Sequence, residues 1–182
     1  MKNITLSGLA GSGKTTIGRL LAEKLKYEFI SVGNFSRKFA KQNFNMNINE
    51  FQQYCLKHLE IDNKIDSEFQ EYCNKTGKLV IDYRLGFHFI KDALHVFLKV
   101  SETEAAKRLM KAKRISEFGS QNEQEIKQTM NKRNLEMRER FIKIYNIDFT
   151  DISNYKLVID TDKFKNLEDI TNTIISKYNS HI

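Results

Sequence analysis

The pattern of hydrophobic and polar residues distinguishes two kinds of segment along the chain. Short runs rich in apolar residues predict β-strands at 3–7, 28–31, 78–82, 95–100 and 156–160. Between them, apolar residues recur every three or four positions and predict helices over 14–24, around 37, at 48–59 and 61–74, from 101, through 126–144 and at 167–178. Wholly apolar strands that alternate with helices are typical of parallel sheets covered on both faces. We therefore expect a three-layer α/β/α fold with a parallel five-stranded sheet.

The breaks between these elements predict a single domain over residues 1–182. Proline is absent, so the breaks are read from Gly, Asn and Asp, and Val32-Gly33-Asn34 predicts a turn. Ser101 and Glu104 have the spacing of a capping box, in which each side chain binds the backbone amide of the other residue. No stretch of the sequence has the composition of a linker between two domains.

Composition and charge exclude several classes of protein. With 40% hydrophobic and 29% charged residues the chain has an ordinary globular balance, and no apolar run approaches the roughly 20 residues needed to cross a bilayer. Cys55 and Cys73 lack the spacing of a metal site, so we expect a reducing, cytoplasmic location and no membrane. The net charge of +7 predicts an anionic partner. Its basic residues are spread without interleaved aromatics, so nucleic acid is not expected, and we expect a monomer.

The strongest chemical signal is the segment from Gly8 to Thr15, which matches the P-loop pattern GxxxxGK[ST] at every fixed position. Its glycines let successive backbone amides point at phosphate oxygens, and the helix that begins near Lys14 directs its positive end toward the same anion. A strand before the loop and an amphipathic helix after it argue against a chance match. We expect ATP to be bound by Gly8, Ala10, Gly11, Ser12, Gly13, Lys14, Thr15 and Thr16.

A magnesium ion is expected beside the phosphates. The Thr15 hydroxyl is the predicted protein ligand, and a carboxylate at the end of a neighbouring strand should hold the water shell of the ion. Asp82 and Asp160 both end apolar strands. We favour Asp82, because Arg84 follows two residues later and places a guanidinium at the same strand end, and we interpret Asp160 as a turn residue.

A P-loop alone does not specify the reaction, and the arginines narrow the choice. Phosphoryl transfer needs cations around the transferred group and exclusion of water. The polar stretch 116–122 is flanked by Arg108, Arg114, Arg133, Arg138 and Arg140. This arrangement is typical of a helix–loop–helix lid, here about residues 112–124, and the spacing of Arg133 and Arg140 places them on one helix face. A solvated face with Glu136 and Glu139 as intrahelical partners explains these arginines equally well.

Several segments together resemble the short, archaeal-type branch of the cytidylate kinase family. Besides the P-loop, they occur in family order at 31–37, 61–66, 80–85, 133–140, 144–151 and 155–161. Each is weak alone, and together they are fairly specific. The resemblance implies transfer of the γ-phosphate of ATP to CMP or dCMP with Mg²⁺, and a helical acceptor-binding insertion at about 34–75.

The same resemblance implies roles for individual residues. Arg37, Asp62, Asp66 and Arg84 would bind the acceptor, with both arginines on its phosphate. The catalytic set, whose last two members would close over the phosphates, would be Lys14, Arg84, Arg133 and Arg140. An ordinary pair of carboxylates near a helix start explains Asp62 and Asp66 equally well.

Two positions depart from the family pattern. Tyr83 stands where Gly is common, and its side chain would crowd a close backbone approach. Met137 stands where a carboxylate is usual, and the adjacent Glu136 is offset by about 100° around the helix. Two alternatives therefore stay open: a P-loop kinase with another small-molecule acceptor, and a non-catalytic module that binds ATP or nucleic acid. Asp148 and Asp151 are interpreted as residues of caps and turns.

Overall fold

A parallel sheet forms the centre of the protein. The computed structural model describes residues 2–111 and 122–180, without the side chains of residues 49, 56, 59 and 62. Its strands are β1 (Asn3–Ser7), β2 (Glu28–Ser31), β3 (Leu79–Asp82), β4 (Ala93–Lys99) and β5 (Leu157–Asp160). They are parallel and are ordered β2-β3-β1-β4-β5, which confirms the predicted five-stranded sheet. Leu6 of β1 pairs with Asp82 of β3, so these two strands end side by side.

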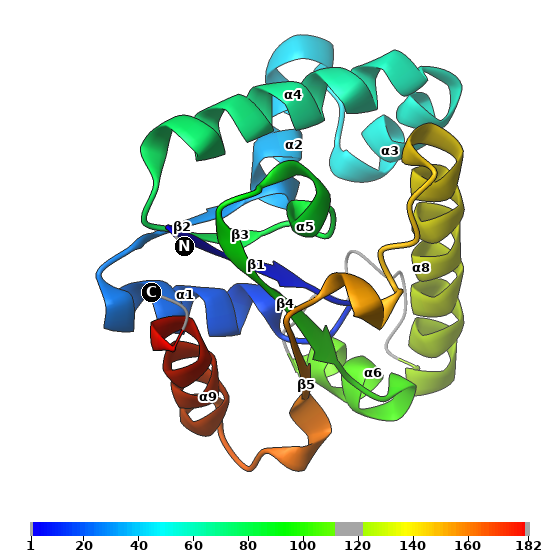
Figure 1. The fold of residues 1–182 in the computed structure, drawn as a ribbon. Coiled ribbons are helices and arrows are strands. Elements are labelled where there is room, and N and C mark those ends of the chain that lie inside the picture. The colour runs from blue at the N-terminus through cyan, green and yellow to red at the C-terminus, as the bar shows by residue number, and fades with distance from the viewer. Residues whose placement is uncertain (1, 112–121, 181–182) are drawn as a thin grey trace.

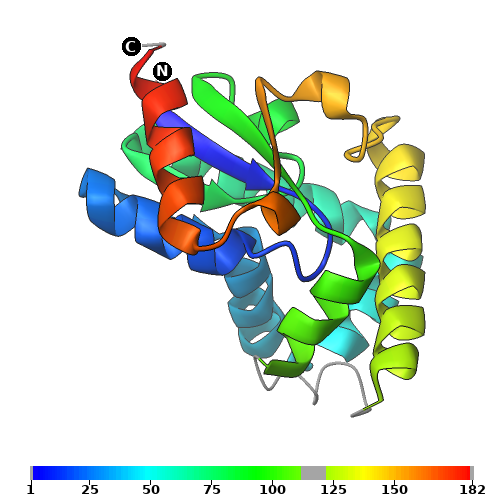
Figure 2. The same ribbon diagram turned by 90° about the horizontal axis from the view of Figure 1, so that it is seen from below.

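Helices connect the strands and cover both faces of the sheet. They are α1 (Lys14–Leu25), α2 (Val32–Phe44), α3 (Ile48–Lys57), α4 (Leu59–Thr76), α5 (Gly86–Phe89), α6 (Glu102–Lys111), α8 (Glu123–Tyr145) and α9 (Leu167–Asn179). Two 3₁₀ helices, η1 (Ile152–Asn154) and η2 (Thr161–Lys163), flank β5. In Figure 1, α1 and α9 lie on one side of the sheet and α2 to α4 on the other, while α8 runs along one edge of the molecule. Figure 2 shows the same arrangement from below.

Two local predictions are wrong. Residues 32–34 form the first turn of α2 and not a turn before it, because the extended backbone of Ser31 (φ −142°) leads directly into the helix. The capping box forms only in part: the Ser101 hydroxyl accepts from the amide of Glu104, but the Ser101 amide donates to Asp162 at 2.9 Å. A carboxylate that is distant in sequence has taken the place predicted for Glu104, whose side chain binds Arg108.

Two hydrophobic clusters fill the space on the two faces of the sheet. The first joins the strands to α1 and α9, with Leu6, Leu21, Val96 and Ile174 among its buried members. The second joins the strands to α4, α5 and α8 and includes Phe69, Ile81, Phe141 and Phe149. Because each cluster contains side chains from both the sheet and its covering helices, the three layers pack as one structure.

The C-terminal half of α8 is tied to the loop that follows it. Arg138 donates to one carboxylate oxygen of Asp148 from Nε (2.9 Å) and Nη2 (2.5 Å), and the hydroxyl and amide of Thr150 donate to the other. The hydrogen bond with Arg138 is the main reason why the pKa of Asp148 is lowered to about 2. Asp151 accepts from the amide of Ser153 and caps η1. Both aspartates therefore stabilise the fold, as their interpretation in caps and turns predicted.

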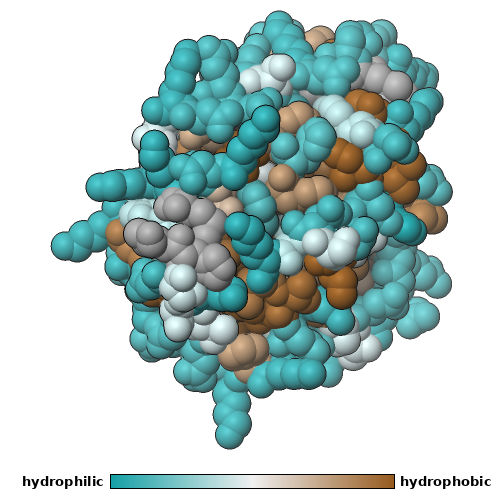
Figure 3. Space-filling model, viewed as in Figure 1, coloured by the Kyte–Doolittle hydropathy of each residue, from teal (hydrophilic) through white to brown (hydrophobic). Residues whose placement is uncertain are grey.

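The surface is largely hydrophilic in the view of Figure 3, where hydrophobic residues gather toward the middle of the face. On α8, Leu135 and Ile142 are large hydrophobic residues with exposed side chains. Within residues 2–111 and 122–180, the structure contains no helix with the length and apolar character that a membrane span requires.

Candidate active site

The loop between β1 and α1 has the backbone that a phosphate cradle needs. Gly8, Gly11 and Gly13 have φ angles of 140°, 78° and 88°, in the region that favours glycine. A Cβ atom at Gly8 would lie 2.4 Å from the carbonyl oxygen of Leu98 on β4, so no larger residue fits there. The loop is therefore shaped by its glycines and not by the side chains around it.

Helix α1 begins at the end of this loop and presents its first turn to it. Its N-cap is Gly13, and among the described residues no side chain caps its free amides. Lys14 is buried, and its Nζ donates to the carbonyl oxygens of Gly8 and Leu9, both at 2.8 Å. A helix N-terminus with uncapped amides and a lysine held beside the loop form a site that fits the phosphates of a nucleotide.

The predicted magnesium residues lie together. The Thr15 hydroxyl donates to a carboxylate oxygen of Asp82 at 2.8 Å, from the first turn of α1 to the end of β3. A hydroxyl and a carboxylate beside a phosphate loop fit Mg²⁺, which keeps several waters and takes few protein ligands. Asp160, by contrast, caps η2 by accepting from the amide of Asp162, as expected of a turn residue.

A cavity of about 740 Å³ extends from the P-loop to α8 and to the start of α9. We call it the central cavity. Of the residues expected to bind ATP, those that line it are Ala10, Gly11, Gly13, Lys14, Thr15 and Thr16. Gly8 lies at the end of β1, and Ser12 is fully buried, where its Oγ accepts from Lys14. The cavity is large enough for a pair of small ligands, since single ligand sites commonly enclose about 300–1,000 Å³.

Three arginines line the central cavity together with the P-loop. Arg84 follows β3, and Arg133 and Arg140 come from one face of α8, as their spacing predicted. Burial is the main cause that lowers the pKa of Arg84, and repulsion from Arg133 and Arg140 adds to it, although Asp82 acts in the opposite direction. The Nε of Arg84 is buried and has no hydrogen-bond partner among the described residues. This arginine cluster is a site for an anion, because clustered guanidinium groups are stabilised by phosphate.

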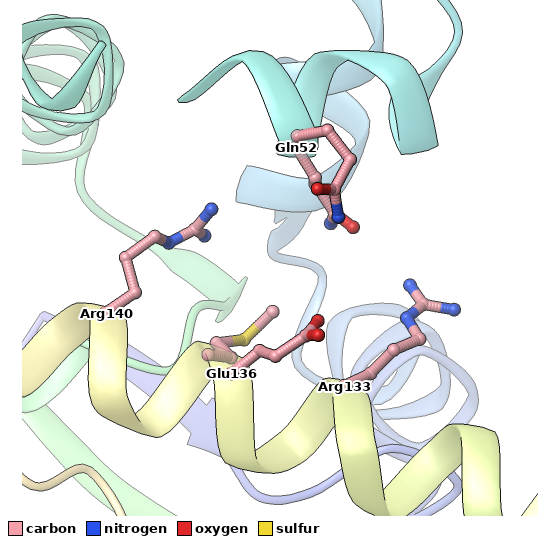
Figure 4. Close-up of a pocket in the computed structure, with 6 residues that line it drawn as sticks. Gln52, Arg133, Glu136 and Arg140 are labelled. Atoms are coloured by element: carbon pink, nitrogen blue, oxygen red, sulfur yellow. The ribbon is translucent and has the colours of Figure 1, made fainter. Parts of the chain in front are cut away.

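A smaller pocket of about 40 Å³ adjoins the central cavity between α3 and α8. Figure 4 shows Glu136 between Arg133 and Arg140 on α8, with Gln52 pointing toward them from α3. Glu136 and Met137 both line this pocket, so the helical offset of about 100° between them still leaves Glu136 at its wall. Positions 136 and 137 are three and four residues after Arg133, and both therefore belong to the stripe that Arg133 and Arg140 define.

Asp66 on α4 lines the central cavity and is 7% exposed. The hydroxyl of Tyr83 donates to one of its carboxylate oxygens at 2.7 Å, and the hydroxyl of Tyr145 to the other at 2.5 Å. Burial raises the pKa of Asp66, while Tyr145, Tyr83 and Arg140 act to lower it. The ring of Tyr83 is 2% exposed and packs between Phe69 and Phe89, so it lies in the core, while the residue borders the central cavity.

Of the other residues predicted to bind the acceptor, the structure describes the side chain of Arg37 but not that of Asp62. Arg37 on α2 lines the central cavity, and its Nη1 donates to Asn34 at 3.1 Å. The side chain of Asp62, the residue Arg114 and most of the predicted lid at 112–124 lie outside the described residues. Arg108, on the other side of that segment, lines the central cavity and donates to the Thr161 hydroxyl at 2.8 Å.

Sequence reasoning missed one end of the central cavity and one contact of the loop. Thr161, Phe164 and Lys165, which follow β5, line the cavity beyond Arg108. Ligand sites of parallel sheets lie at the carboxyl ends of the strands, so the end of the strand predicted at 156–160 could have indicated these residues. Asn134 accepts from the amide of Ala10 at 3.3 Å and joins α8 to the P-loop, a contact for which the sequence carries no signal.

A P-loop beside a parallel sheet, with a cluster of arginines in the same cavity, defines the class of P-loop kinases. Comparison with known proteins agrees, because the model of the cytidylate kinase-like family matches residues 3–163. The chain belongs to that family. Family membership and fold together support nucleotide kinase activity.

The chain is also similar to individual proteins of known name. It is 36% identical over 166 residues to the cytidylate kinase of Methanococcus vannielii, which covers 88% of this chain and 91% of that protein. It is 48% identical over 175 residues to an S-adenosylmethionine-dependent nucleotide dehydratase of Lacinutrix mariniflava. This match covers 96% of the chain but only 35% of the Lacinutrix protein. The fold is similar to that of a shikimate kinase from Bacteroides thetaiotaomicron, with a TM-score of 0.65, 19% identity and 98% of both chains covered.

Proposed function

We propose that this chain transfers the γ-phosphate of ATP to a nucleoside monophosphate, with CMP or dCMP as the acceptor and Mg²⁺ as the metal. The observation that carries the proposal is the shared cavity, which is lined both by the P-loop and by the cluster of Arg84, Arg133 and Arg140. Membership of the cytidylate kinase-like family supports the choice of acceptor.

Each part of the site has a task in this reaction. Lys14 and the amides of α1 hold the donor phosphates, and Thr15 and Asp82 hold magnesium beside them. Arg37 and Arg84 bind the acceptor phosphate, and Arg133 and Arg140 stabilise the charge on the transferred group. The acceptor phosphate is already an anion, so no side chain has to remove a proton from it. Catalysis then consists of positioning and charge stabilisation.

An ADP-release assay tests the proposal directly. ADP formation is measured with CMP, dCMP, UMP, AMP and non-nucleotide acceptors, with the Lys14→Ala variant as the inactive control. Stimulation by CMP or dCMP is the expected result. Stimulation by a non-nucleotide alone would support a P-loop kinase of another acceptor class, and ADP release that no acceptor stimulates would contradict phosphoryl transfer. Binding of single-stranded RNA that weakens steeply with salt, without turnover, would favour the non-catalytic alternative.

A second role follows from the Lacinutrix relative, because that protein is named a nucleotide dehydratase. We infer that the phosphorylated nucleotide made by this chain serves a dehydratase of that kind. The test supplies the purified, ATP-free product to the Lacinutrix protein with S-adenosylmethionine. Dehydration of the product would support this role, whereas dehydration of the monophosphate but not of the product would contradict it.

The cytoplasmic location, the monomeric state, the single domain and the 112–124 lid stay predictions.

A further inference from the structure

Helix α8 contacts the P-loop directly, at the part of the loop formed by Ala10 and Gly11, which we call the loop tip. The side-chain Oδ1 of Asn134 on α8 accepts from the backbone amide of Ala10 at 3.3 Å. Both residues are half-buried and line the central cavity. One amide of the loop therefore donates to α8, although the loop is shaped to present its amides to phosphate.

The packing around this hydrogen bond holds the loop tip close to α6 and α8. Ala10 packs against a buried cluster that the two helices share, formed by Ala105, Ala106, Leu109, Ile126 and Met130. A Cβ atom on Gly11 would lie 2.7 Å from the Cβ of Ala105, so α6 approaches the loop as closely as a glycine allows. The loop tip is thus in contact with α6, and Asn134 joins it to α8.

The residue that precedes Asn134 on α8 is Arg133, a member of the arginine cluster. In the proposed function, Arg133 stabilises charge on the transferred group, which requires a set distance between its guanidinium and the phosphates on the loop. A displacement of about 1 Å in such a geometry can cost about a hundredfold in rate. We propose that Asn134 is a positioning residue, which fixes α8 and its arginines relative to the P-loop through the amide of Ala10.

This inference rests on the proposed function and adds a residue that acts through geometry alone. The Asn134 side chain is uncharged, so it cannot replace an arginine in stabilising the transferred phosphate. An interaction that matters only for the geometry of transfer lowers kcat, whereas loss of ordinary substrate binding raises KM. A fall in kcat without a matching rise in either KM is therefore the signature of the positioning role.

The first experiment measures amide hydrogen exchange at Ala10 by NMR, which does not depend on turnover. Asn134→Leu removes the acceptor at similar size, and Asn134→Asp keeps an acceptor oxygen at the same place. Loss of the hydrogen bond should speed exchange at Ala10 about fivefold in Asn134→Leu, whereas Asn134→Asp should resemble the unaltered protein. The matched control is Asn131→Leu, the same change at an exposed position of α8 that does not line the cavity. Equal exchange at Ala10 in all four proteins would overturn the inference.

The second experiment measures ADP release by the same proteins with CMP as the acceptor. Asn134→Leu should lower kcat about tenfold and change the KM for ATP and for CMP by less than about twofold. Asn134→Asp should keep kcat within about threefold of the unaltered protein, and Asn131→Leu should leave it unchanged.

Two outcomes of the second experiment would overturn the inference. They are full turnover in Asn134→Leu, and an equal loss of kcat in the Leu and Asp variants of Asn134, which would show that the acceptor oxygen is not what matters. If no acceptor stimulates ADP release by the unaltered protein, the proposed function fails and the positioning role fails with it. Exchange at Ala10 still reports the contact in that case, so the two failures are distinguishable.

Discussion

Replacement of Arg84 by methionine tests two effects of the arginine cluster separately. One is its effect on the stability of the protein without ligand, and the other is its effect on binding of the acceptor. In the protein without ligand, Arg84 is half-buried beside Arg133 and Arg140, and burial lowers its pKa most, with repulsion from both arginines adding to it. Its Nε makes no hydrogen bond to the described residues. The favourable contacts are the charge of Asp82 and the ring of Phe149, 5.9 Å away.

The magnitudes follow from these contacts. Taking a charged group out of water costs several kcal/mol, a penalty that Arg84→Met removes together with the repulsion from Arg133 and Arg140, while loss of the attraction to Asp82 and of the ring contact offsets part of this gain. Without ligand, Arg84→Met should therefore leave the free energy of unfolding unchanged or raise it by about 2 kcal/mol. Loss of a charge-assisted contact with phosphate should weaken CMP binding about a hundredfold. At a CMP concentration of about a hundred times the Kd of the unaltered protein, CMP should add about 2.7 kcal/mol to that protein and about 0.4 kcal/mol to the variant.

Urea unfolding with and without CMP, followed by circular dichroism, measures both quantities. Arg138→Met is the matched control, because Arg138 lies on α8 and binds Asp148 instead of lining the cavity. This control should lower stability and keep the full effect of CMP. An Arg84→Met protein that loses about 2 kcal/mol or more without ligand, or that keeps the full stabilisation by CMP, would refute the reasoning.

Three further predictions concern the donor site, the acceptor site and a buried histidine. Lys14→Ala should lower kcat by about a thousandfold with the circular dichroism spectrum unchanged, since the donor phosphates lose their cation; a tenfold effect or less would contradict its role. Arg37→Ala should raise the KM for the acceptor about tenfold and leave that for ATP unchanged, and equal changes in both would contradict its assignment. Burial lowers the pKa of His95 to about 4 from an ordinary 6.5, so its neutral form stabilises the fold above pH 6.5 and this contribution, about 3 kcal/mol, is lost as pH falls toward 4. In urea titrations, His95→Gln should show a smaller loss of stability over that pH range than the unaltered protein, and an equal loss would contradict the assignment.

The sheet and the donor half of the site could be predicted from sequence because their signals are local. The P-loop is contiguous from Gly8 to Thr15, and wholly apolar strands identify themselves as buried. Even the pairing of Thr15 with Asp82 followed from a general rule, since the carboxyl ends of neighbouring parallel strands lie at one edge of a sheet.

The acceptor half could not be predicted to the same extent, because it is made by packing between distant helices. Gln52 and Glu136 share a pocket only because α3 faces α8 across it, and neither residue carries a motif. The capping box failed for the same reason. Asp162, 61 residues away, binds the Ser101 amide that a local pattern assigned to Glu104.

The position of Tyr83 in the structure differs from the one that its departure from the family pattern suggests. From sequence, a tyrosine in place of glycine predicts crowding beside Arg84. In the structure, the Tyr83 amide donates to Leu6 at 3.1 Å and continues the sheet contact, while the ring lies in the core and its hydroxyl binds Asp66. The bulk of the side chain therefore lies in the core, and its hydroxyl holds Asp66 at the edge of the central cavity. A Tyr83→Gly change toward the family pattern should instead cost about 3–5 kcal/mol of stability, as loss of a large buried ring does, and should remove a hydroxyl that donates to Asp66.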